Sequence, residues 1–273
     1  MDDEFFHAVI TSGNTIKALT EVIYGNFIDA EFIVCSLGIF IKSENKDKTC
    51  SFSSNLKRDG FLSYNIKSNF CFTITIKALR DILKSVKKNS CSVAIIITED
   101  PSTDRGKLKI EVESNKSGSS VIDGNIIDVT LMKEELGDNF EDYYSDYTKA
   151  YMDSYKPYYN HANVIRSEEF SKSKRIKEKQ TTINLTIQGS FFLLEAGVPG
   201  VMTGYYQTGQ RENGNPEYQN KYAHGLFSSI MKLPSLDKHV KIHQPLTEEY
   251  PIMFSSDIPS LGSITITIKG NIK

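Results

Sequence analysis

The sequence has no tryptophan, no Cys-x-x-C pair and no apolar run close to the ~20 residues that cross a bilayer. Its opening residues, MDDEFFHAVI, are acidic and lack the basic and long apolar stretches of a secretion signal, so we expect neither a signal peptide nor a membrane segment. The four cysteines lie in apolar or β-rich text, at Cys35, Cys50, Cys71 and Cys91. They favour reduced, buried thiols in an intracellular protein over a disulfide framework.

Catalytic, nucleotide-binding and metal-binding motifs are scarce as well. There is no P-loop and no glycine-rich fingerprint between a strand and a helix, and no serine or cysteine stands in a nucleophile elbow. His239 and His243 are spaced for one face of a strand or helix, but the further ligand that a zinc site needs is missing nearby. We therefore predict a protein that is not an enzyme and that binds no metal and no cofactor.

What the sequence does contain is a balanced charge that is unevenly placed. The 273 residues carry 32 Lys and Arg against 34 Asp and Glu, a net charge of -2 at pH 7. Yet five of the eight residues from Lys172 to Lys179 are cationic. The chain is also 39% hydrophobic, which is enough for a substantial core in one large domain or two ordinary ones.

Periodic apolar residues predict short helices among many strands. Leu79, Ile82 and Val86 form a stripe at helical spacing, with the nearby cations on a separate face. The predicted helices cover residues 13–25, 77–88, 170–179 and 221–234. The predicted strands lie in residues 5–12, 29–44, 49–56, 60–67, 69–76, 91–100, 107–114, 125–132, 162–167, 182–197, 239–246, 250–257 and 262–269.

The order of these elements repeats once along the chain. Each half runs strand, helix, several strands, helix and more strands, which predicts an α+β protein. Between the halves the text becomes rich in tyrosine and poor in aliphatic residues. We predict an N-terminal domain at residues 1–134, an interdomain connector at 135–161 and a C-terminal domain at 162–273.

All four predicted helices carry lysine or arginine. Such side chains neutralise backbone phosphates without reading base sequence. For any single helix, a lysine-rich face in contact with solvent is an adequate explanation. For four helices together, in a chain of net charge -2, the pattern favours a nucleic-acid surface.

Several stretches of the chain resemble one known family. The opening FFHAVITSGNTIKALTEVI, the hairpin AEFIVCSLGIFIKS, the stretch RDGFLSYNIKSNFCFTITIKALRDILKSVKKNSCSVAI and the closing YPIMFSSDIPSLGSITITIKGNIK are similar to the DNA sliding clamps of the proliferating cell nuclear antigen (PCNA) type. The similarity rests on element order and scattered residues over nearly the whole length. It implies two similar domains, each with two helices packed on antiparallel sheets, and a ring-shaped homotrimer with helices lining its channel.

The resemblance also implies a function and a surface. A sliding clamp is a processivity factor without catalysis that encircles duplex DNA, binds it without regard to sequence and tethers DNA polymerase; a clamp loader is a further expected partner. It works in the nucleus, or at a cytoplasmic replication site in a viral case. The DNA-binding residues predicted from the basic helices and this family are Lys17, Lys77, Arg80, Lys84, Lys87, Lys172, Arg175, Lys179, Lys221 and Lys232. In the third helix two registers stay open, one that aligns Phe170 with the family and one that buries Ile176.

Clamps bind short peptides beneath the connector, and that region departs from the family here. Glu44 and Lys48 stand where the family often has Met and His, and the connector is tyrosine-rich. Tyrosines suit peptide interfaces, although they equally well pack a connector onto its own sheet. The predicted partner-binding residues are Glu44, Lys48, Tyr143, Tyr147, Tyr151, Pro251 and Ile272.

Two alternatives stay open. The first is a diverged clamp-like subunit, either of a hetero-trimeric checkpoint ring or of a viral relative that does not close into a ring. The second is a β-rich structural or capsid-associated protein, in which the basic helices are incidental. Charge reversal at Lys84 and Arg175 distinguishes the second alternative, because only there does it leave function intact.

Overall fold

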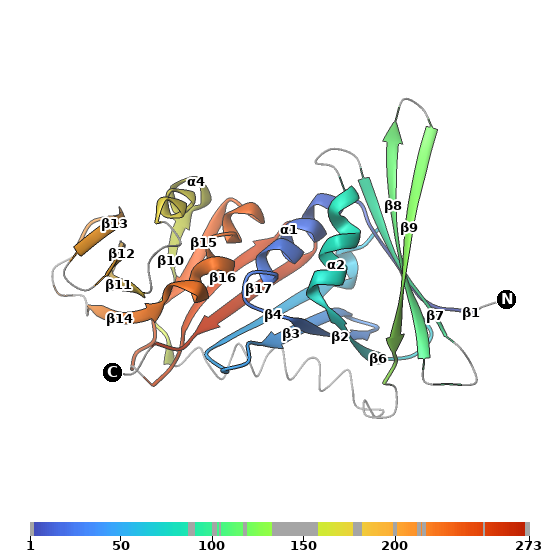
Figure 1. Ribbon diagram of the computed structural model, residues 1–273, viewed down its shortest axis with the longest axis horizontal. Coiled ribbons are helices and arrows are strands. Elements are labelled where there is room, and N and C mark those ends of the chain that lie inside the picture. The colour runs from blue at the N-terminus through green and yellow to red at the C-terminus, as the bar shows by residue number, and fades with distance from the viewer. Residues whose placement is uncertain are drawn as a thin grey trace.

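A computed structural model gives the structure of the chain, and Figure 1 shows antiparallel sheets with short helices along one side. The predicted connector lies almost entirely outside the described residues, and Tyr143, Tyr147 and Tyr151 fall there. The structure describes residues 3–86, 91–99, 103, 105–116, 119–132, 158–176, 182–198, 201–211, 214, 217–247 and 249–270.

A five-stranded sheet forms one end of the molecule, at the right of Figure 1. Its order is β5-β1-β7-β8-β9, with all described pairs antiparallel, and β9 is the outermost strand. The strands are β1 (Asp3–Ile10), β5 (Ser63–Ile66), β7 (Cys91–Glu99), β8 (Arg105–Lys116) and β9 (Ser119–Thr130).

An eight-stranded sheet joins the two halves of the chain. β17 of the second half pairs with β4 of the first half, from Gly262 opposite Leu56 to Ile268 opposite Cys50. The two halves therefore share one hydrogen-bonded sheet. In order across it, the strands are β10 (Asn163–Arg166), β15 (His239–His243), β16 (Ile252–Ile258), β17 (Gly262–Ile268), β4 (Cys50–Lys57), β3 (Gly38–Glu44), β2 (Asp29–Cys35) and β6 (Phe70–Thr75).

A four-stranded sheet forms the opposite end, at the left of Figure 1. Its order is β13-β12-β11-β14, so β13 is the outermost strand here. The strands are β11 (Thr182–Gln188), β12 (Phe191–Val198), β13 (Val201–Thr208) and β14 (Tyr218–Ala223).

The helices are shorter than predicted, and several end in a 3-10 turn. The helix predicted at 77–88 is regular only to Ile82, continues as a 3-10 turn to Ser85 and becomes extended at Val86. The helical elements are α1 (Gly13–Ile23), η1 (Arg58–Gly60), α2 (Ile76–Ile82), η2 (Leu83–Ser85), α4 (Ser167–Phe170), η5 (Ser171–Arg175), η6 (His224–Leu226), α5 (Phe227–Ile230) and η7 (Leu233–Ser235).

The helix predicted at 221–234 is wrong over its first turn. Tyr222 is buried in strand β14, and the helical residues begin only at His224. The reason is that a spacing of four places two residues on one face of a strand as well as on one face of a helix. Tyr218 and Tyr222 follow the strand period, and their hydroxyls hydrogen-bond at 2.5 Å in the core.

A second contact joins the halves at the end of α1. The Asn26 side chain donates to the backbone carbonyl of Leu226 at 2.7 Å and accepts from the Ser228 hydroxyl at 2.6 Å. Gly25 lies so close that a methyl group in its place would be 2.6 Å from that hydroxyl oxygen. With the shared sheet, this contact sets the helices of the two halves next to one another.

Candidate nucleic-acid interface

The helices form one layer because each turns its apolar residues towards a sheet. Ile16, Leu19 and Ile23 of α1 are buried in the same core as Leu83 and Phe227 from the helical elements of both halves. The charged residues of these helices are left on the opposite side. Figure 1 shows α1, α2 and α4 on the same side of the sheets.

The third helix buries both of its candidate anchors. Phe170 packs against Phe192 and Tyr206, with ring centroids 5.8 Å and 6.4 Å apart, and Ile176 is also buried. Both fit because the helix tightens from α to 3-10 geometry at Ser171 and ends at Arg175. The backbone of Arg175 is described but its side chain is not, and Lys87 and Lys179 lie outside the described residues.

Lys17 reaches from α1 to the end of the second helix. Its ammonium donates to the carbonyl oxygens of Lys84 at 3.2 Å and Val86 at 2.6 Å. The last carbonyls of a helix lack intrahelical donors and carry partial negative charge, so a lysine is favourable there. Lys17 therefore ties α1 to the end of η2, and a DNA phosphate would compete with these carbonyls.

Arg80 and Lys232 lie on either side of α1 and share one carboxylate. The Arg80 Nε donates to Glu21 Oε1 at 2.7 Å, and this hydrogen bond raises the pKa of Arg80. The Lys232 ammonium donates to the Glu21 backbone carbonyl at 2.9 Å and lies 3.9 Å from its carboxylate. Both cations also lie over the Tyr24 ring, at 4.1 Å and 5.9 Å from its centroid.

Two further cations form ion pairs along their own helices. Lys84 pairs with Asp81 at 2.7 Å, which lowers the pKa of Asp81, and Lys172 pairs with Glu169 at 2.7 Å. All four side chains are 45% or more exposed. Exposed pairs of this kind contribute little net stability and are weakened by salt, so phosphates can replace these carboxylates.

The side chains of Lys77 and Lys221 form no ion pair or hydrogen bond within the described ranges, but they lie on different surfaces. Lys77 is exposed in the first turn of α2. Lys221 is not on a helix as predicted: it lies on β14, in register with Asn184 and Glu195. Those positions alternate with the buried Ile183 and Tyr222 and so turn away from the helical layer, because strand side chains alternate between faces.

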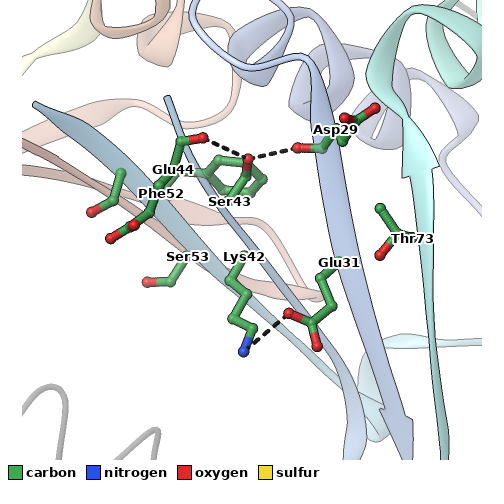
Figure 2. Close-up of a pocket in the computed structure, with 9 residues that line it drawn as sticks. Asp29, Glu31, Lys42, Ser43, Glu44, Phe52, Ser53 and Thr73 are labelled. Carbon is green, nitrogen blue, oxygen red and sulfur yellow. Dashed lines mark hydrogen bonds and ion pairs between the residues drawn. The ribbon is translucent and has the colours of Figure 1, made fainter. Parts of the chain in front are cut away.

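Glu44 lines a depression in the eight-stranded sheet, of about 450 Å³. Figure 2 shows Lys42 pairing with Glu31, and the Ser43 hydroxyl hydrogen-bonding to the carbonyls of Asp29 and Glu44. The pair distance is 3.1 Å, and the Ser43 distances are 2.6 Å and 3.4 Å. The other lining residues are Ser51, Phe52, Ser53 and Thr73.

The depression lies largely on the sheet face opposite the helices. Glu31 and Lys42 are directly opposed on β2 and β3, whereas the next opposed pair, Phe32 and Ile41, belongs to the core that also buries α1. The two predicted surfaces, helical and partner-binding, are thus separated by the thickness of the sheet.

The other predicted partner-binding residues lie near this sheet or outside the described ranges. Lys48 has a positive φ of 52° in the β3–β4 turn, and the adjacent Thr49 carbonyl accepts from the Lys269 amide at 2.8 Å. The hairpin and the chain's last described strand therefore lie side by side. Ile272 falls outside the described residues.

Pro251 contacts the end of the predicted connector. Its carbonyl accepts from the Tyr159 hydroxyl at 2.6 Å, and the rings of Tyr158 and Tyr250 stack at 4.5 Å. These two connector tyrosines pack onto the chain's own second half, as one of the two sequence interpretations expected for tyrosines of this segment.

Glu21 and Tyr24 were not identified from the sequence. An acidic residue four positions after Lys17 indicates at most a pair within α1. Their actual partners come from residues 59 and 211 positions away. Only the packing of three helices brings these groups together.

Within the part of the chain that the structure describes, there is neither a metal-binding cluster nor a membrane-spanning helix. No group of three or more His, Cys, Asp or Glu side chains there is placed to hold a metal ion. His243 hydrogen-bonds to the Ser255 hydroxyl at 3.1 Å. None of the described helices is both long and apolar enough to cross a membrane.

Comparison with known proteins finds a match in fold but none in sequence. No family model matches the chain, and no curated protein matches its sequence. The structure does match solved structures, among them the crystal structure of a PCNA2–PCNA3 complex from Sulfolobus tokodaii. That match has a TM-score of 0.70 and 12% sequence identity, and it covers 98% of this chain and 100% of the other. The chain therefore has the α+β fold of PCNA-type clamps.

Proposed function

We propose that the chain is a DNA sliding clamp, a processivity factor that encircles duplex DNA and tethers replication proteins without catalysing a reaction. The observation that supports this most is the clamp fold over nearly the whole chain, together with cations from both halves on one helical layer. Such a layer attracts phosphates irrespective of base sequence. The protein would act at the site of replication, in the nucleus or in a viral cytoplasmic replication site.

Ring assembly is part of this proposal. The outermost strands β9 and β13 lie at opposite ends of the molecule, and an uncovered strand edge is a template for pairing with another chain. Ile126 of β9 and Tyr205 of β13 are large apolar residues that are 62% and 63% exposed. Joining β9 of one copy to β13 of the next is a head-to-tail contact, and contacts of this type generate a ring when the rotation between copies closes. We infer a homotrimer with the helices facing the channel.

Native mass in solution tests this assembly. Light scattering with and without duplex DNA, at two salt concentrations, should give three subunits and a DNA association that weakens as salt rises. A single-subunit mass at every concentration, with no DNA association at low salt, would contradict the proposal.

A second candidate is a subunit of a ring built from different chains. It is favoured by the similar solved structure, which is a complex of two different proteins, PCNA2 and PCNA3. This candidate predicts that the chain alone stays monomeric and forms a ring only when a second clamp-like chain is co-expressed.

Partner proteins would bind on the other side of the sheet. The depression at Glu44 carries three carboxylates and one lysine, so the proposed clamp-binding peptides of polymerase or clamp loader would present basic or polar residues there. Replacing Glu44 with lysine should weaken peptide binding and leave DNA association unchanged.

A further inference from the structure

Four side chains at the seam of the two halves form a compact group, which we call the Glu21 cluster: Glu21, Tyr24, Arg80 and Lys232. Glu21 belongs to α1 and Tyr24 directly follows it, Arg80 comes from α2, and Lys232 follows α5. One carboxylate thus serves two cations, one from each half of the chain.

The cluster is less exposed than the other ion pairs of the helical layer. Glu21, Arg80 and Lys232 are 33%, 33% and 35% exposed, whereas Lys84 is 64% exposed beside Asp81. Water and salt therefore screen the cluster less, and its carboxylate is a stronger competitor for its cations.

Carboxylate oxygens and phosphate oxygens accept from the same donors in the same way. A phosphate that approaches Arg80 must displace Glu21 from the guanidinium, or share it with a nearby negative charge. Lys232 is held twice, by the carboxylate and by the Glu21 backbone carbonyl, so it would remain partly engaged without the carboxylate.

We propose that Glu21 sets the strength of DNA contact by holding Arg80 and Lys232 back from phosphates. It keeps the centre of the basic layer weakly attractive, so that contact with DNA stays loose. This inference rests on the proposed function as a clamp. Tyr24 positions both cations through its ring face and is not itself a DNA contact.

The test is binding of a short linear duplex, measured by fluorescence anisotropy at several salt concentrations. Glu21→Gln should bind at least about fivefold more tightly at low salt, and the slope of log K against log[salt] should steepen by about 0.9 for one added phosphate contact. The matched control is Glu168→Gln, which removes the same charge from an exposed residue of α4 that has no described ion pair. It should give less than half of that gain on a logarithmic scale.

Two further variants keep the test decisive. Glu21→Asp preserves the charge but shortens the side chain, so it should also raise DNA affinity, by less than Glu21→Gln. This variant provides a test even if Glu21→Gln does not fold. Arg80→Gln should reduce DNA affinity more in the Glu21→Gln background than in the wild-type chain. The reason is that only in the Glu21→Gln background is Arg80 released from the Glu21 carboxylate.

The outcomes distinguish a failure of the role proposed for Glu21 from a failure of the proposed clamp function. Equal affinities for Glu21→Gln and Glu168→Gln, or no gain for Glu21→Asp with an additive Arg80→Gln effect, would overturn the role of Glu21. Failure of the wild-type chain to associate with any duplex at low salt would instead overturn the proposed function.

Discussion

Gly25, just after α1, lies in close contact with α5 of the other half of the chain. A Cβ atom there would lie 2.6 Å from the Ser228 hydroxyl oxygen, 2.9 Å from that of Ser229 and 3.0 Å from the Ser229 amide nitrogen. We predict that Gly25→Ala lowers the free energy of unfolding by about 1–3 kcal/mol through overpacking. Urea denaturation measures this.

A neighbouring glycine provides the control. At Gly225 in η6 a Cβ atom would have no other atom within 4 Å, so Gly225→Ala should change stability by less than about 0.5 kcal/mol. Equal effects at the two glycines would show that the seam is looser than the structure indicates.

His243 makes the stability of the sheet depend on pH. Burial, and to a lesser degree the charge of Lys241, lowers the pKa of His243 below its ordinary value. The unfolded chain then binds the proton more readily, so stability is full above the unfolded pKa of about 6.5 and falls as pH drops towards the folded value.

We therefore predict that the free energy of unfolding is lower at pH 5.5 than at pH 7.5, and that His243→Asn reduces this difference. Urea titrations at the two values provide the measurement. His161→Gln, at an exposed position, is the control and should retain the wild-type difference. An unchanged pH dependence in His243→Asn would rule out His243 as the cause of the difference in stability.

At the scale of elements, the outermost strands are the parts on which the proposed assembly depends. Replacing Ile126 on β9 or Tyr205 on β13 with lysine puts a charge where the proposed interface is apolar, so each variant should sediment as a single subunit. Leu62→Lys is the control, because Leu62 is 71% exposed and lies outside both strands. If all three variants kept the wild-type mass, the β9–β13 contact would be excluded.

The elements themselves were predictable where one period dominates. The helix that starts at Gly13, the hairpin of β2 and β3 and the closing pair β16 and β17 were all expected from the sequence. The last residues of β14 were predicted as helical because Tyr222 and Leu226 are four residues apart, a spacing that also fits one face of a strand, and β13 was not predicted as a strand.

The basic surface was predictable only in outline. Placing Lys17, Arg80 and Lys84 on helices needs only local periodicity, and all three lie on the helical layer. Their acceptors do not follow from local pattern. Lys17 meets carbonyls 67 and 69 residues away, and Arg80 meets a carboxylate 59 residues away. Lys221 was misplaced together with the helix that was expected to carry it.

At the scale of the whole molecule, the fold places the basic helices, the central sheet and the outermost strands on different parts of the surface. Helices from both halves lie on one side, the eight-stranded sheet spans the middle, and β9 and β13 lie at the two ends (Figure 1). A fold shared at 12% identity shows that the arrangement depends on alternation and packing more than on particular side chains. In the proposed function, sliding on DNA would be a property of the whole ring and not of any single residue or element.

Retention on circular DNA tests the central claim most directly. The protein is incubated with nicked circular DNA and any loader it requires, separated from free protein by gel filtration at moderate salt, and the DNA is then cut once with a restriction enzyme. A topological clamp should stay with the circle and be released by linearisation, because its hold does not depend on affinity. Dissociation from circular and linear DNA at the same rate would contradict the account.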